Sequence, residues 1–275
     1  MTHVHIDRDD AIGTITLDRR ERFNSLDVQT AQDLRRAGLQ LARDPATRVV
    51  IVRGLPEMFC SGADLKFIHA GGDEGDLEYL TNRSEPQRPG YGDTFKQILE
   101  YIHSTISEIR RAPKPFIAAV DGVAAAGGFG IAMACDLVVA SSRASFEWAY
   151  AKTALTGAES ATFFLPRLIG LRRSMELAFL NPRLTADRAL EYGLVTAVSP
   201  VETFDDEVRR IANAIAAGPA HSFAVAKELL NQAAGMDRLD DHLDRELEEL
   251  TRAADGAEVA EGIAAFFEKR APRYA

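Results

Sequence analysis

Cysteines and long apolar runs are both scarce in this chain of 275 residues. The two cysteines, Cys60 and Cys135, are too few for a disulfide framework, so a reducing, cytoplasmic location is expected. The longest apolar stretch, around Ile117–Val123, is broken by Asp121 and Gly122, and no membrane span is expected. The N-terminal residues show neither a basic segment nor an apolar run, so no secretory signal is expected.

Positive charge is also in deficit. The 32 basic side chains face 41 acidic ones, giving a formal net charge of −9. A strongly acidic protein repels polyanions over long range, so a nucleic-acid partner is disfavoured. A small anionic ligand remains compatible with this charge, because a few local basic side chains can outweigh a distant, screened field.

Several familiar cofactor motifs are missing. The six histidines form no H-x-x-x-H pair, and the two cysteines lie far apart, so no metal site is expected. A dinucleotide site fails on spacing, because Gly128-x-Gly130 would need a third small residue where Met133 stands. We therefore expect neither a metal nor a redox cofactor.

Four segments have the patterns of β-strands. Residues 11–17 alternate apolar and polar side chains, as in a half-buried strand. Residues 48–54, 116–120 and 137–140 are continuous apolar runs, typical of strands buried on both faces. Each is followed by a glycine-containing turn or a helical pattern, which predicts an α/β fold.

Helical and loop patterns divide the rest of the chain. Ser25 is a candidate cap for a helix over residues 26–43, and residues 71–92 read as a long surface loop that could shape a pocket. From Thr203 onward the pattern is helical. We therefore expect an α/β core over residues 1–200 and a helical subdomain over residues 201–275.

Two glycine-rich turns are the candidates for chemistry. Residues 58–66 (MFCSGADLK) follow the strand at 48–54, and residues 120–130 (VDGVAAAGGFG) follow the strand at 116–120. Where a strand enters a helix through small residues, free N–H groups and the helix dipole converge, which suits an anion or a developing oxyanion. The same glycines could instead only relieve steric strain.

Taken together, the chain from about residue 10 to its C-terminus resembles the enoyl-CoA hydratase/isomerase, or crotonase, family. The segments that carry the resemblance are FCSGADLK at 59–66, KPFIAAVDG at 114–122, GGFGIAMACD at 127–136, LPRLIG at 165–170, GLV at 193–195 and GIAAFFEKRAP at 262–272. The resemblance implies a crotonase-like α/β spiral of strand–strand–helix (ββα) turns. It also implies a C-terminal helical region that builds trimers or dimers of trimers.

The resemblance also implies site residues. The thioester oxygen would lie between the backbone N–H groups of Ala63 and Gly127, paired donors that stabilise an enolate. Phe266 and Lys269 match a pair that reaches the nucleotide from a neighbouring subunit, although either could be a core or solvated residue. The remaining implied contacts to coenzyme A (CoA) come from Phe23, Ser25, Leu26, Asp64, Leu65 and Lys66.

The sequence departs from the family's hydratases at both catalytic glutamates. The first position is Gly130, and ungapped counting places Tyr150 at the second. Two carboxylates on opposite sides of a water molecule are the machinery for adding water to a double bond. Simple hydration is therefore doubtful.

Other residues could supply the missing acid or base. Some family isomerases carry an acid at the position that matches Ala158, and Glu159 is the next residue. Glu159 could also be a catalytically idle carboxylate in the first turn of a helix. Tyr150 could donate a proton or merely pack the pocket. Weaker candidates are Asp121, Glu147, His69, His103 and Cys60.

The sequence thus predicts an enzyme that acts on an acyl-CoA thioester through a stabilised enolate. This enzyme would resemble the family's isomerases more than its two-glutamate hydratases. CoA would be part of the substrate rather than a separate cofactor. Three alternatives stay open: a hydratase with a nonstandard acid, a decarboxylase or hydrolase of a CoA ester, and a catalytically silent CoA-binding protein.

Overall fold

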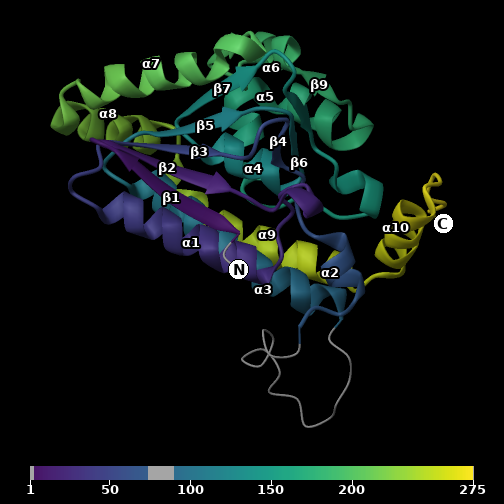
Figure 1. Cartoon of the computed structure of the whole chain (residues 1–275). Helices are drawn as coiled ribbons and strands as arrows, with labels where there is room; N and C mark the ends of the chain where they lie inside the picture. The colour runs from purple at the N-terminus through teal and green to yellow at the C-terminus, as the bar shows by residue number, and fades with distance from the viewer. Residues whose placement is uncertain (1–2, 74–89, 275) are drawn as a thin grey trace.

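Two β-sheets form the framework of the computed structural model, which describes residues 3–73 and 90–274 (Figure 1). In the larger sheet, β1 and β2 form an antiparallel hairpin, and the other strands follow in parallel. Its order is β1 (Val4–Asp9), β2 (Ile12–Leu17), β3 (Val49–Arg53), β5 (Phe116–Val120), β7 (Leu137–Ser141) and β10 (Ala197–Ser199). The four strands predicted from the sequence are confirmed to within one residue at each end.

A smaller sheet stands beside the first. Its order is β4 (Met58–Cys60), β6 (Val123–Ala125), β8 (Ser145–Glu147) and β9 (Leu184–Thr185). The chain passes from β3 to β4, from β5 to β6 and from β7 to β8, and each pair leads to a helix. These helices are α2 (Leu65–His69), α4 (Gly127–Ala134) and, after the short η2 (Tyr150–Thr153), α5 (Ala161–Leu180). The predicted ββα spiral is confirmed.

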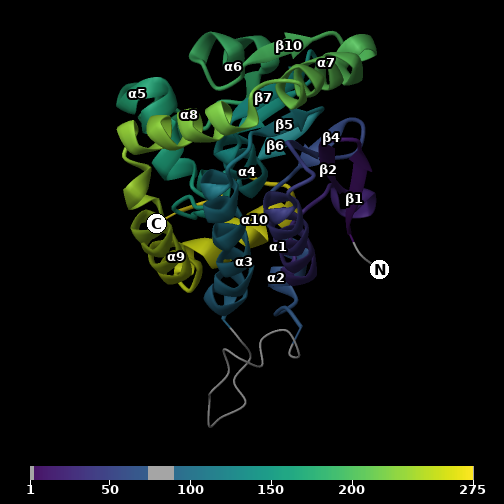
Figure 2. The ribbon, with the colours of Figure 1, turned by 90° about the vertical axis from the view of Figure 1, so that its left-hand side faces the viewer.

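Burial on both faces explains the apolar character of the central strands. In β5 every residue is buried. Ile117 belongs to a cluster with Val208 of α7 (Phe204–Ala216), whereas Phe116 and Val120 belong to the main core. Figure 2 shows α7 on one side of the sheet and α1 and α3 on the other.

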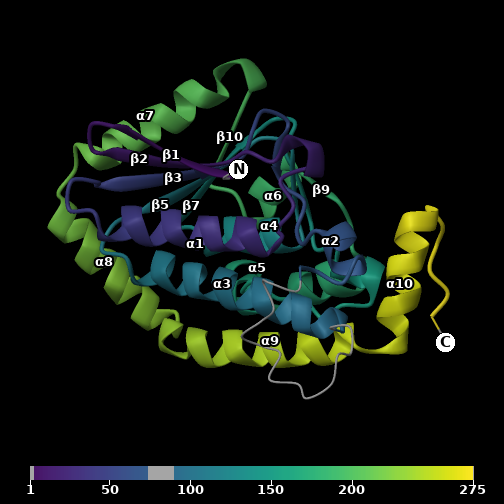
Figure 3. The ribbon, with the colours of Figure 1, turned by 60° about the horizontal axis from the view of Figure 1, so that its bottom comes forward.

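Three helices, α1 (Val28–Arg43), α3 (Tyr91–Arg111) and α9 (Leu239–Ala254), run side by side beneath the sheets (Figure 3). The prediction that Ser25 caps α1 is wrong. The cap is Asp27, whose side chain accepts the Thr30 N–H at 2.8 Å. The helix begins two residues later than predicted because Leu26 forms a parallel bridge with Ala63.

Every described element after β10 is helical, as predicted. These elements are η3 (Val201–Thr203), α7, α8 (Ala220–Ala233), η4 (Met236–Arg238), α9 and α10 (Ala257–Glu268); η1 (Arg20–Arg22) and α6 (Ala186–Tyr192) lie earlier in the chain. Most of the predicted loop at 71–92 lies outside the described residues, and its last two residues belong to α3. Within the described ranges, no helix is long and apolar enough to cross a membrane.

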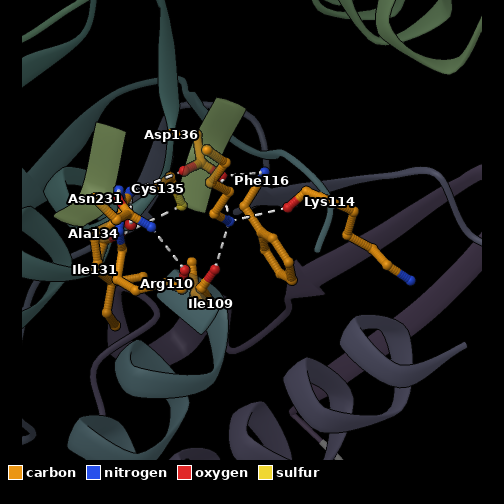
Figure 4. Close-up of polar contacts among 10 residues, drawn as sticks. Ile109, Arg110, Lys114, Phe116, Ile131, Ala134, Cys135, Asp136 and Asn231 are labelled. Atoms are coloured by element: carbon orange, nitrogen blue, oxygen red, sulfur yellow. Dashed lines mark hydrogen bonds and ion pairs between the residues drawn. The ribbon is translucent and has the colours of Figure 1, made fainter. Parts of the chain in front are cut away.

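A partly buried polar cluster fastens α8 to the end of the larger sheet (Figure 4). Lys227 Nζ donates to the carbonyl oxygens of Ile109 (2.7 Å) and Lys114 (3.0 Å) and pairs with Asp136 Oδ2 (2.8 Å). Arg110 Nη1 pairs with the other oxygen of Asp136 at 2.9 Å. Each oxygen of the Asp136 carboxylate thus has a cationic partner, as a carboxylate withdrawn from solvent requires.

Candidate active site

A pocket of about 380 Å³ opens where the neighbouring parallel strands β4, β6 and β8 end. The carboxyl ends of parallel strands are a common place for ligand sites, because the turns that follow them lie side by side. The walls of this pocket are mostly apolar or small side chains. Its lining residues include Ser61, Ala63, Phe95, Ala125, Ala126, Gly127, Tyr150, Leu155, Glu159 and Leu250.

The turn after β4 leaves one backbone N–H unused. Leu26 donates its N–H to the Gly62 carbonyl at 2.8 Å, and Asp64 donates its N–H to the Leu26 carbonyl at 2.9 Å. The intervening Ala63 therefore turns its own N–H away from Leu26, as alternation along an extended segment requires. Among the described residues, no acceptor takes the Ala63 N–H, and Ala63 lines the pocket.

The turn after β6 lies directly against the first turn. A Cβ atom on Gly62, whose φ is +93°, would lie 2.8 Å from the Ala126 Cβ and 3.3 Å from the Gly127 nitrogen. Ala126 itself has φ 45° and ψ −118°, an uncommon conformation for a residue with a side chain, and its N–H is fixed by the Glu147 carbonyl at 3.1 Å. This strained residue sets the direction in which α4 begins.

Gly127 is the first residue of α4, where helix N–H groups have no partner within the helix. Within the described ranges, no hydrogen bond is formed by the Gly127 N–H. The pocket therefore offers two backbone donors, Ala63 and Gly127, from two separate turns. An acceptor oxygen held by such a pair would be stabilised as it gained negative charge.

Glu159 reaches the same place from the segment before α5. A Cβ atom on Gly127 would lie 2.7 Å from Glu159 Oε1, so the carboxyl group stands against this glycine. The helix starts at Ala161, and Glu159 lies before it in the left-handed conformation (φ 49°). Its side chain is only 3% exposed and faces the pocket, unlike an idle carboxylate on a solvated first helical turn.

The small residue at position 130 makes this arrangement possible. A Cβ atom on Gly130 would lie 2.3 Å from the Glu159 carbonyl oxygen and 2.8 Å from the Glu159 Cβ. A larger side chain at position 130 and this Glu159 backbone cannot occupy the same space. A glutamate at position 130, which the resemblance implies for a hydratase, would therefore collide with the backbone of Glu159.

Burial tunes the titration of Glu159. It raises the pKa of this carboxyl from 4.5 to about 7, although a hydrogen bond from Tyr150 opposes the shift. The Tyr150 hydroxyl contacts both Glu159 Oε2 and the Ala158 carbonyl oxygen (3.1 Å). Burial and the neighbouring Glu159 raise the pKa of Tyr150 well above 10, so its phenol cannot act as a base at neutral pH.

Glu147 is the other acid that the sequence placed near the pocket, and it does line the wall. Its carboxylate pairs with Lys152 Nζ at 2.5 Å and accepts a hydrogen bond from Asn181 Nδ2 at 3.0 Å. Asp121 lies outside the lining and holds Arg143 and the Ser141 hydroxyl. Both carboxylates therefore already have side-chain partners.

The weaker candidates lie outside the pocket lining. His69 hydrogen-bonds to the Tyr91 hydroxyl at 3.0 Å. His103 is buried, and burial lowers its pKa to about 3, so it stays neutral. Cys60 is buried beneath the first turn, and burial raises its pKa to about 12, which removes the thiolate that a nucleophile needs.

The residues implied for CoA contact are only partly gathered in the pocket. The lining contains Phe23, Ser25, Asp64, Leu65, Lys66 and Phe266. Leu26 lies outside the lining and holds the first turn, and Lys269 lies outside it at the exposed end of α10. Asp64 caps α2 and pairs with Arg19 and Arg22, so its carboxylate already has partners.

Phe266 lines the pocket of its own chain. The reason is the docking of α10 on η2. Gly262 packs against the Thr153 backbone so closely that a Cβ atom would come within 2.8 Å. The Tyr274 hydroxyl donates to the Lys152 carbonyl oxygen at 3.0 Å.

No sequence motif singled out Glu246, which holds the segment around Glu159 from α9. The same is true of Arg19 and Arg22, which pair with Asp64. Glu246 lies 86 residues from its partner Ser160, and only the packed fold brings the two together.

Comparison with known proteins assigns the chain to a family. The family model described as enoyl-CoA hydratase/isomerase matches residues 7–275. The chain belongs to the enoyl-CoA hydratase/isomerase family.

Members of this family with different activities are similar to the chain along nearly its whole length. It is 30% identical to a 1,2-epoxyphenylacetyl-CoA isomerase of Escherichia coli (strain K12), over 98% of this chain and 96% of that protein. It is 29% identical to a 4-chlorobenzoyl coenzyme A dehalogenase of Arthrobacter sp, over 97% and 91% of the two chains. Among solved structures, an enoyl-CoA hydratase from Mycobacterium avium subsp. paratuberculosis K-10 matches with a TM-score of 0.85 and 30% identity, covering 99% of this chain and 98% of the other.

Proposed function

We propose that this protein is an isomerase of an unsaturated acyl-CoA thioester, which moves a double bond through an enolate. In this proposal the N–H groups of Ala63 and Gly127 hold the thioester oxygen, and Glu159 moves the proton. The supporting observation is that the Glu159 carboxyl stands against Gly127, beside one of the two unused donors.

The reaction needs one base and no external reactant. Glu159 removes a proton from C2 of a 3-enoyl thioester, and the electron pair flows toward the thioester oxygen between the two N–H groups. The same carboxyl then returns the proton to C4. The double bond has moved from C3=C4 to C2=C3, and no atom has been gained or lost.

A pKa near 7 suits this exchange of one proton in both directions. A base is most useful when its pKa lies near the working pH, because it can then both accept and release the proton. Burial, rather than a neighbouring charge, is the largest cause of the shift in Glu159. The apolar setting that raises the pKa also strengthens the hydrogen bonds to the oxyanion.

Hydration fits these residues less well. It requires a group that activates water and a second that delivers a proton, held on opposite sides of the water. Gly130 and Tyr150 occupy the positions of the two hydratase glutamates, and Glu147 is engaged by Lys152 and Asn181. Glu159 is thus the single buried carboxyl that lines the described pocket with a raised pKa.

The proposal also includes substrate binding and assembly. Lys66, Phe23 and Phe266 lie at the pocket and would contact CoA, together with Lys269, which follows the last residue of α10, the helix that carries Phe266. CoA enters as part of the substrate, and no metal or redox cofactor takes part. We propose a cytoplasmic homotrimer or dimer of trimers.

A panel of 2-enoyl-CoA and 3-enoyl-CoA thioesters in deuterated water, analysed by mass spectrometry, tests this proposal. Interconversion of the two isomers with deuterium incorporation, lost in Glu159→Gln, would support it. Accumulation of a 3-hydroxyacyl product would show a hydratase instead. Binding without exchange or turnover of any thioester would show a silent CoA-binding protein.

A further inference from the structure

The segment that carries Glu159 is strained and cannot hold itself. Glu159 and Ser160 both adopt the left-handed conformation, with φ of 49° and 64°. Residues with side chains rarely adopt this conformation, and two in succession require support from their surroundings. Ser160 is the cap residue of α5, but its hydroxyl donates to the Glu159 carbonyl oxygen and does not cap the helix.

Support comes from α9. The Glu246 carboxyl group accepts the Ser160 N–H at Oε2 (2.8 Å) and the Thr162 N–H at Oε1 (3.1 Å). The Thr162 hydroxyl donates to the same Oε1. Glu246 thereby caps α5 from a distance of 86 residues in sequence and binds the N–H group of Ser160, the residue that follows Glu159.

Glu246 has no cationic partner among the described residues. It is 5% exposed, and the titratable side chains that face it are His103 from α3, at 3.7 Å, His242 from α9, also at 3.7 Å, and Glu159 itself. Burial lowers the pKa of both histidines, that of His103 to about 3. Peptide N–H groups and a threonine hydroxyl therefore hold this buried carboxyl. Without these donors, burying the carboxyl would cost free energy of folding.

We infer that Glu246 is a positioning residue, which holds the Glu159–Ser160 turn so that the Glu159 carboxyl stays against Gly127. The inference rests on the proposed function, because it assigns Glu246 a role through Glu159. Glu246 lies outside the pocket lining, so its removal should affect the proton-transfer step and leave thioester binding nearly intact.

The test compares Glu246→Gln and Glu246→Ala with Glu248→Gln, an exposed acid on the same helix. Deuterium exchange of a 3-enoyl-CoA gives kcat and KM for each variant. We expect kcat to fall at least about tenfold in Glu246→Gln, because an amide cannot accept all three hydrogen bonds. We expect KM to change by less than about twofold and Glu248→Gln to match the wild type.

Combining Glu246→Gln with Glu159→Gln separates positioning from a general structural role. If Glu246 acts through Glu159, it should cause no further loss of kcat once Glu159 has been replaced. A further loss of equal size in the double variant would overturn the inference. So would an unchanged kcat in a folded Glu246→Gln protein.

A milder pair of variants serves if both Glu246 variants fail to fold. Thr162→Val removes one donor to Glu246 and keeps the shape of the side chain, and Thr162→Ser restores the hydroxyl. We expect kcat to fall in the first and recover in the second. Equal kcat in both would overturn the inference.

Failure of the proposed function is distinguishable from failure of this inference. If Glu159→Gln keeps full exchange, Glu159 is not the base and the proposed function fails. The positioning role would then be decided by a crystal structure of Glu246→Gln, or of Thr162→Val if that protein alone folds. We expect the Glu159 carboxyl to have left Gly127 in that structure, and an unmoved carboxyl would overturn the inference.

Discussion

Replacing Glu159 by glutamine should stabilise the protein at alkaline pH and abolish its proposed activity. The folded state raises the pKa of this carboxyl from 4.5 to about 7 through burial. A shift of this size corresponds to roughly 3 kcal/mol of free energy. That energy is a cost to the folded state whenever the carboxyl is ionised, and glutamine, which has the same shape and no charge, avoids it.

The sign of the pH dependence follows from proton binding. Between pH 4.5 and 7 the folded protein holds a proton on Glu159 that the unfolded chain has released. This contribution to stability is therefore lost as the pH rises through that window. Glu246, whose pKa burial raises to about 8, adds to the same slope in the wild type; because the Glu159 charge contributes to that shift, the difference between wild type and variant reports Glu159 together with its coupling to Glu246.

Urea unfolding at pH 4.5, 6 and 8 measures the first effect, because the linear dependence of stability on urea gives the free energy of unfolding. We expect equal stability at pH 4.5 and a gain of up to roughly 3 kcal/mol for Glu159→Gln at pH 8. Deuterium exchange should fall by about 10² to 10⁴ in the same variant. The exposed Glu248→Gln serves as the control and should change neither quantity.

Three results would refute this reasoning. A variant less stable than the wild type at pH 8 would show that the ionised carboxyl is not a cost to the fold. A variant that keeps exchange would show that the ionised carboxyl does no chemistry. An exchange rate of the wild type that stays flat between pH 6 and 8 would contradict the same claim.

Three further predictions follow from the same contacts. Gly127→Ala should lower exchange at least about a hundredfold, because its methyl group would meet Glu159 Oε1 and Leu26 Cδ1 at 2.7 and 3.3 Å; a fully active variant would contradict the close packing. Tyr150→Phe should move the midpoint of the pH–rate profile upward, because the hydroxyl hydrogen bond lowers the pKa of Glu159; a downward or absent shift would contradict this role. Lys227→Met should lower the free energy of unfolding, measured in urea, by roughly 3 kcal/mol, because it leaves Asp136 without one of its two cationic partners. The exposed Lys269→Met is the control and should leave the free energy of unfolding unchanged. Equal stability of the two variants would contradict the anchoring of α8.

Local patterns in the sequence were enough to predict the framework. The apolar runs at β3, β5 and β7 could only be strands covered on both faces, and the structure shows α7 on one face and the main core on the other. The two glycine turns also lie together as expected, because their strands β4 and β6 are neighbours. Which strands are neighbours depends on the whole spiral, and this adjacency was predicted from the chain-wide resemblance to the family.

Details that depend on contacts between distant segments were not predictable. The bridge between Leu26 and Ala63 moved the start of α1 and made Asp27 its cap. The docking of Gly262 on Thr153 placed Phe266 at the pocket of its own chain. The left-handed turn at Glu159 depends on the absence of a side chain at Gly130, which no local periodicity reveals.

A crystal structure with a stable CoA thioester analogue tests the central claim most directly. We predict that the thioester oxygen lies within about 3.1 Å of both the Ala63 and Gly127 nitrogens, as effective oxyanion donors require, with C2 facing the Glu159 carboxyl. A thioester oxygen bound to only one of these nitrogens, or an acyl chain that leaves Glu159 out of reach of C2, would contradict the account.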